Sequence, residues 1–184
     1  MSDLRPRREL IEIGEEKFWL LFSIKAIDEI QSELNLPIFD AAEHLLNAAK
    51  MDINQNTIRV YAGVLSALIN VNGKKKVSLS EAVEMLTTEN YVETAFRLVE
   101  LFWESMPEKE DYDPDDEEEE TEKKAERSVN VAQILYIGCT VLGYSEREVF
   151  SMTLRKFYLL YNQHLVAKGI KKDENIDEED MFRD

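Results

Sequence analysis

The feature that most constrains the fold is an acidic run at 107–127, which reads PEKEDYDPDDEEEETEKKAER. The run holds 12 acidic and 4 basic residues, a net charge of −8, which is half of the chain's net charge of −16. Tyr112 is its one aromatic residue, so burial cannot offset the repulsion between like charges or the entropy cost of ordering the run. We therefore predict a flexible acidic linker between two apolar-rich segments.

This charge pattern predicts four parts in the 184 residues. They are an N-terminal domain at 1–106, the linker at 107–127, a small C-terminal helical segment at 128–170 and an acidic tail at 171–184. A segment of about 40 residues is near the lower limit for independent folding. The C-terminal segment is therefore expected to pack on the N-terminal domain, on another copy of the chain or on a partner.

The hydropathy pattern predicts a mainly α fold with a small N-terminal β-hairpin (α+β). Residues 8–22 are β-branched or aromatic on both sides of Gly14, which suits a tight turn. A lone hairpin is marginal in water, so its apolar face is expected to lie on a helical bundle. The helical periodicity and capping residues predict helices at 24–35, 40–50, 55–69, 79–87, 89–105, 129–142 and 154–168, with a short helical stretch after Ser145. The predicted caps are Ser23, Asp40, Ser78, Ser145 and Thr153.

Composition excludes several classes of protein. The net charge of −16 argues against a partner that is mainly a phosphate backbone, so no nucleic acid is expected. No apolar run approaches the length of a membrane span, and the N-terminus lacks the apolar stretch of a signal peptide. The one cysteine, Cys139, cannot form an internal disulfide, which favours a reducing cytoplasm.

The sequence predicts no catalytic residue, metal site or cofactor. His44 and His164 have no ligand-type neighbour at helical spacing and are interpreted as ordinary helix-surface histidines. Cys139 lies within an apolar helix pattern, so we expect a buried, unreactive side chain. Gly73 and the lysines after it lack the upstream glycine of a phosphate-binding loop. An enzyme without a recognisable motif would need a deep pocket that holds a group with a strongly shifted pKa.

The acidic run contains a partial match to a calcium loop. Asp111, Asp113, Asp115 and Glu122 fall at positions 1, 3, 5 and 12 of an EF-hand count. Asp116, however, stands at position 6, where the sharp turn needs glycine. The match is therefore interpreted as chance spacing in a dense run of acids.

The predicted last helix carries an apolar and aromatic stripe. It consists of Phe157, Leu160 and Tyr161 and is extended by Tyr158 and Leu165. Core packing is the default interpretation of such a stripe. A partner-binding or self-association surface is the alternative, because so small a segment has few neighbours of its own.

The order of these elements resembles that of the tail assembly chaperones of long-tailed, siphovirus-like bacteriophages. Ile11-Glu12-Ile13-Gly14, followed by Phe18–Phe22 and an amphipathic helix, is similar to the start of that family. The C-terminal segment is similar to its leucine-glycine, small helix, methionine-threonine, helix signature. The matching residues are Leu142, Gly143, Tyr144, Ser145, Glu148, Val149, Phe150 and 152–157, with Met152 and Thr153 at the start of the final helix. Together the two matches cover about half of the chain, and the acidic middle matches only as a variable spacer.

The resemblance implies a non-enzymatic role in tail assembly. Such chaperones coat the apolar tape measure protein in the host cytoplasm, are released as tail tube subunits polymerise and are absent from the finished virion. By analogy, residues 1–106 would coat the tape measure protein and 129–169 would be the extension that recruits the major tail tube protein. The acidic charge leaves one alternative open, an adaptor or DNA mimic that binds a basic protein surface.

Overall fold

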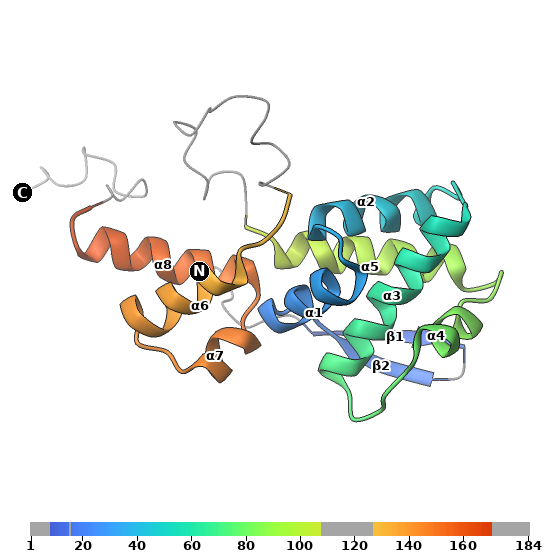
Figure 1. Cartoon of the computed structure of the whole chain (residues 1–184), viewed down its shortest axis with the longest axis horizontal. Coiled ribbons are helices and arrows are strands. Elements are labelled where there is room, and N and C mark those ends of the chain that lie inside the picture. The colour runs from blue at the N-terminus through green and yellow to red at the C-terminus, as the bar shows by residue number, and fades with distance from the viewer. Residues whose placement is uncertain (1–7, 15, 108–126, 171–184) are drawn as a thin grey trace, which may run out of the picture.

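The computed structural model describes residues 8–14, 16–107 and 127–170. Within these residues the protein is mainly helical with one two-stranded antiparallel hairpin, which confirms the predicted fold class. Figure 1 shows helices α6, α7 and α8 at one end of the molecule, and the hairpin with α2 to α5 at the other. The predicted linker, the predicted acidic tail and the partial calcium loop lie outside the described residues, apart from Pro107 and Arg127 at the ends of the linker.

The hairpin consists of β1 (Glu9–Ile13) and β2 (Glu16–Leu20). Its register pairs Ile11 with Phe18 and Ile13 with Glu16, so Gly14 lies in the turn at φ +62° as the sequence predicts. One face of the ribbon is buried, against α5 and α3, as expected. The buried side chains on that face are Ile11, Ile13, Phe18 and Leu20.

Five helices complete the N-terminal part: α1 (Ile24–Leu34), α2 (Ile38–Ala49), α3 (Gln55–Asn72), α4 (Leu79–Met85) and α5 (Tyr91–Ser105). Helix α3 is central, because residues 60–69 are all buried and the helix packs on α1, α2, α4 and β2. The buried Tyr61 hydroxyl donates to the Tyr91 carbonyl oxygen at 3.0 Å, and burial raises the pKa of Tyr61 well above its usual range.

Most predicted caps are confirmed, with one correction. The hydroxyls of Ser23, Ser78, Ser145 and Thr153 all accept from backbone N–H groups at helix starts. Asp40 was predicted to cap α2, but that helix begins two residues earlier, at Ile38 after Pro37. Proline fixes its own φ and lacks an N–H, so it fits immediately before a helix as well as after one. Asp40 instead lies in the first turn and forms an ion pair with Arg127 at 2.5 Å.

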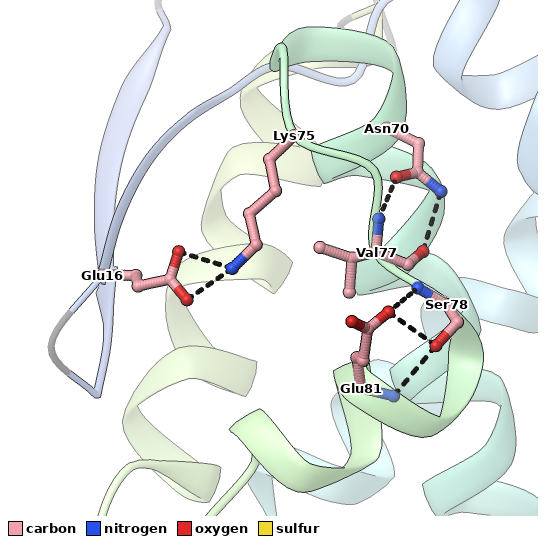
Figure 2. Close-up of polar contacts among 6 residues, drawn as sticks. All are labelled: Glu16, Asn70, Lys75, Val77, Ser78 and Glu81. Carbon is pink, nitrogen blue, oxygen red and sulfur yellow. Dashed lines mark hydrogen bonds and ion pairs between the residues drawn. The ribbon is translucent and has the colours of Figure 1, made fainter.

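In the connection between α3 and α4, side chains form hydrogen bonds with backbone N–H and carbonyl groups that lie outside the regular helical pattern (Figure 2). The Asn70 amide brackets Val77, accepting from its N–H at 2.7 Å and donating to its carbonyl at 3.0 Å. Ser78 and Glu81 form a reciprocal capping box at the start of α4. Lys75 reaches back to Glu16 of the hairpin at 2.7 Å, which ties this turn to β2.

The C-terminal part consists of α6 (Val131–Tyr136), a π-helical turn η2 (Ile137–Val141), α7 (Glu146–Ser151) and α8 (Leu154–Ala167). The π turn divides the helix predicted at 129–142, and the Leu142 N–H donates to Ile137 across five residues at 3.1 Å. Gly138 faces inward here, where a Cβ would lie 2.5 Å from Val149 Cγ2. Cys139 is consequently exposed, so its predicted burial was wrong.

The two parts of the protein pack on each other and share one hydrophobic core. The Ile24 N–H donates to the Met152 carbonyl at 2.8 Å, beside a β-bridge between Ser23 and Thr153. The Gln31 amide also makes two hydrogen bonds with the backbone of Val129, at 2.8 and 3.0 Å. Of the three arrangements expected for the C-terminal segment, packing on the N-terminal part is therefore the one observed.

Candidate interaction surfaces

The described part of the chain presents no cluster of metal-binding side chains. Among residues 8–14, 16–107 and 127–170, no group of three or more His, Cys, Asp or Glu side chains could hold a metal ion. None of the helices in these ranges has the length and hydrophobicity that a membrane span requires.

The two histidines and the cysteine occupy separate places. His44 is half-buried on α2, and its Nε2 lies 3.3 Å from the Asn56 amide nitrogen of α3. His164 is half-buried near the end of α8. Cys139 lies on the π turn. They belong to three different elements and form no common site.

Helix α5 carries an apolar stripe on its solvent side. The stripe consists of Val92, Phe96, Val99 and Trp103, whose spacing of four, three and four residues places them along one side of the helix. Phe96 is 52% exposed and Trp103 is 56% exposed, while the two valines are half-buried against the core. Two large aromatic side chains on one exposed helix face are the usual anchors of a protein interface.

The other exposed flank of α5 is charged. It presents Glu93, Arg97, Glu100 and Glu104 at the same helical spacing. Arg97 contacts Glu93 at 3.4 Å and Glu9 of β1 at 3.1 Å, so this flank faces the hairpin. Phe102 is buried, at the edge of the buried face that is farther from the charged flank. Its ring packs edge-on against Phe39 of α2, with ring centroids 5.8 Å apart. The apolar stripe therefore borders α2, which lies beside α5 in Figure 1.

The predicted stripe on the last helix is divided between core and surface. Phe157 is 1% exposed and lies in the shared core, which corrects its place in the predicted partner-binding set. Tyr158, Leu160, Tyr161 and Leu165 are half-buried, and the Tyr161 ring stacks on Phe157 with centroids 6.4 Å apart. The four half-buried side chains are the ones that could contact a partner without disturbing the core.

The residues that resemble the phage family build the junction with the N-terminal part. Gly143 takes φ +75° where the π turn ends, between Leu142 and Tyr144, and Ser145 with Glu148 forms a capping box for α7. Phe150 is half-buried at the end of α7. Met152 and Thr153 are buried and make the backbone contacts with Ile24 and Ser23. The motif thus has a structural role in this chain.

The α5 stripe was not predicted from the sequence, although a signal for it was present. Residues 91–105 place apolar side chains around more than half of the helix circumference, which is more than one buried face requires. The apolar side chains beyond those of the buried face are the ones that form the stripe. Periodicity alone does not say which apolar side chains face the core.

Comparison with protein-family models, with curated proteins and with solved structures found no match.

Proposed function

We propose that this protein is a non-enzymatic tail assembly chaperone that binds an apolar helical partner, the tape measure protein, through the stripe on α5. The observation that carries the proposal is the pairing of Phe96 and Trp103 on an exposed helix face of a strongly acidic protein. The order of sequence elements, which resembles the phage chaperones, supplies the identity of the partner.

The geometry suits a partner that is itself an amphipathic helix. The four stripe residues span 12 residues of α5, from Val92 to Trp103, which corresponds to about 16 Å along the helix axis. A partner helix that lies along this line can place its own apolar face on both aromatic rings. The high net negative charge keeps copies that crowd along one long partner from aggregating.

The C-terminal segment supplies a second proposed contact, with the tail tube protein. Tyr158, Leu160, Tyr161 and Leu165 are the candidate contact residues, because they are half-buried rather than buried. Tyr136 on α6, which is 65% exposed, adds an aromatic ring to the surface of the same segment.

The test of the proposal is co-purification with a soluble helical fragment of the tape measure protein from the same phage. The double variant Phe96→Ala/Trp103→Ala is expected to bind at least about tenfold more weakly, because alanine truncation of interface anchors costs about 2 kcal/mol or more. Trp19→Ala is the matched control, since Trp19 is 57% exposed but lies on the hairpin, away from the stripe. Its affinity is expected to stay within about twofold of the wild type.

Salt separates this proposal from an adaptor that binds a basic surface. Apolar contacts persist at an ionic strength near 0.5 M, whereas contacts between exposed charges are screened over a few ångströms there. Binding that is lost in high salt and unaffected by the double variant would contradict the proposal. Binding that resists salt and depends on Phe96 and Trp103 is the expected result.

A further inference from the structure

An open pocket of about 730 Å³ lies at the junction of the two parts of the protein. Its walls come from the connection between β2 and α1, from the end of α3, from α7 and from Arg8 before β1. Ser23 lies in its lining beside the bridge to Thr153. A ligand in this pocket would therefore touch both parts of the chain at the place where they join.

Three cationic side chains surround this pocket: Arg8, Lys25 and Arg147. All three residues are exposed, and among the described residues none of them has an ion-pair partner. Glu146 also lines the pocket but forms no ion pair with them. Three cations at one pocket, with no ion-pair partner among residues 8–14, 16–107 and 127–170, stand out in a chain with 38 acidic residues and 22 basic ones. Their charge is available to an external anionic group.

The pocket also has an apolar side. Leu21, Val71 and Phe150 contribute to its lining, and the latter two are half-buried, so part of their surface is open to a ligand. A ligand that fits such a lining combines carboxylates with an apolar side chain that covers these groups.

We propose that this junction pocket binds an acidic peptide segment that carries an apolar anchor side chain. A nucleic acid fits less well, because phosphate-backbone binding needs a longer track of cations than three side chains around one apolar pocket. The site is separate from the α5 stripe, so this proposal goes beyond the tail assembly function and does not depend on it. Peptide binding here would also stabilise the contact between the two parts of the chain.

The proposal is tested with a fluorescein-labelled peptide, EDGEEFEDGD, which combines acids with one phenylalanine and whose sequence does not occur in the chain itself. The full chain is expected to bind it saturably in fluorescence anisotropy, and unlabelled peptide should raise the melting temperature of the protein. Arg147→Glu and Lys25→Glu are each expected to weaken binding by about fivefold or more. Both changes place an acid in the first turn of a helix, where it is tolerated, so the fold is kept.

Arg59→Glu is the matched charge-reversal control. Arg59 is exposed on α3 and precedes Val71 by twelve residues, which places it about 18 Å from the pocket along that helix. Its affinity for the peptide is expected to remain within about twofold of the wild type.

Three outcomes would overturn the proposal. The first is the absence of saturable peptide binding. The second is a loss of peptide affinity in Arg59→Glu as large as that in Arg147→Glu or Lys25→Glu, which would indicate a general charge effect. The third is tighter binding of a DNA oligonucleotide of the same net charge, which would reassign the pocket to phosphate groups. A peptide in which the phenylalanine is replaced by alanine is expected to bind more weakly than the parent peptide. Equal affinities of the two peptides would contradict the proposed contact between an apolar side chain and the pocket.

Discussion

At the scale of single residues, Gly138 shows how one missing side chain sets the packing of the C-terminal part. A Cβ at this position would lie 2.5 Å from Val149 Cγ2 and 3.4 Å from Phe157 Cε2. Val149 is β-branched and buried, so it has little freedom to move aside. The π turn presents the glycine to α7 and α8 and turns Cys139 outward.

Gly138→Ala is therefore expected to destabilise the protein by about 1–3 kcal/mol, the usual cost of overpacking a filled core. Urea denaturation followed by circular dichroism measures the change in the free energy of unfolding. Cys139→Ala is the control from the neighbouring position, and because Cys139 is exposed its stability should stay within about 0.5 kcal/mol of the wild type. Equal stabilities for the two variants would show that α7 and α8 can move away from this turn.

At the scale of elements, the caps explain why so many helix starts could be predicted. A capping hydroxyl acts within three residues of its own position, so Ser23, Ser78, Ser145 and Thr153 are readable from the sequence. The start of α2 was misplaced because Pro37 and Asp40 both suit a helix start, and local chemistry did not choose between them.

Features that depend on tertiary contacts were beyond this kind of prediction. The π turn at 137–141 accompanies the close approach of Gly138 to Val149, and the exposure of Phe96 and Trp103 depends on which face of α5 the other elements cover. The apolar pattern indicated that these helices are amphipathic, yet it did not say where α2 and the hairpin lie around α5. The junction pocket was likewise unpredicted, because Arg8, Lys25 and Arg147 are far apart in the sequence.

The capping box of α7 also makes a prediction about pH. Hydrogen bonds from the side chain and backbone of Ser145 hold the pKa of the Glu148 carboxyl below its ordinary value of 4.5. A pKa lowered by folding adds stability that is present above pH 4.5 and is lost as the pH falls through the lowered value. Ser145→Ala is expected to return the pKa of Glu148 toward its ordinary value, which carbon NMR of the labelled carboxyl can follow.

The same variant should lower stability at neutral pH by about 0.5–2 kcal/mol, the usual cost of losing an N-cap. Ser32→Ala is the control, since Ser32 is exposed within α1, where alanine is the better helix former. A Glu148 carboxyl that titrates identically in the wild type and Ser145→Ala would contradict the assignment of the cap as the cause.

At the scale of the whole molecule, charge and hydrophobic packing act in opposite directions. A net charge of −16 favours expansion and solubility, while one continuous core joins the N-terminal part to α6, α7 and α8. The joining contacts include core residues from both sides as well as the Gln31 and Ile24 hydrogen bonds. Because these contacts do not require residues 108–126, the two parts should associate without a covalent link.

Residues 1–107 and 127–184, expressed together as separate chains, are therefore expected to co-purify as a one-to-one complex. Gln31→Leu in the larger chain should weaken the complex, because it removes both hydrogen bonds to Val129 and leaves the part-buried N–H groups of Val129 and Ile38 without their acceptor. Glu33→Ala, an exposed change on the same helix, should leave the complex intact. Size-exclusion chromatography with mass determination gives the stoichiometry. Separate elution of the two wild-type chains would mean that the junction depends on the covalent connection, because the shared core alone would then be too weak to hold the parts together.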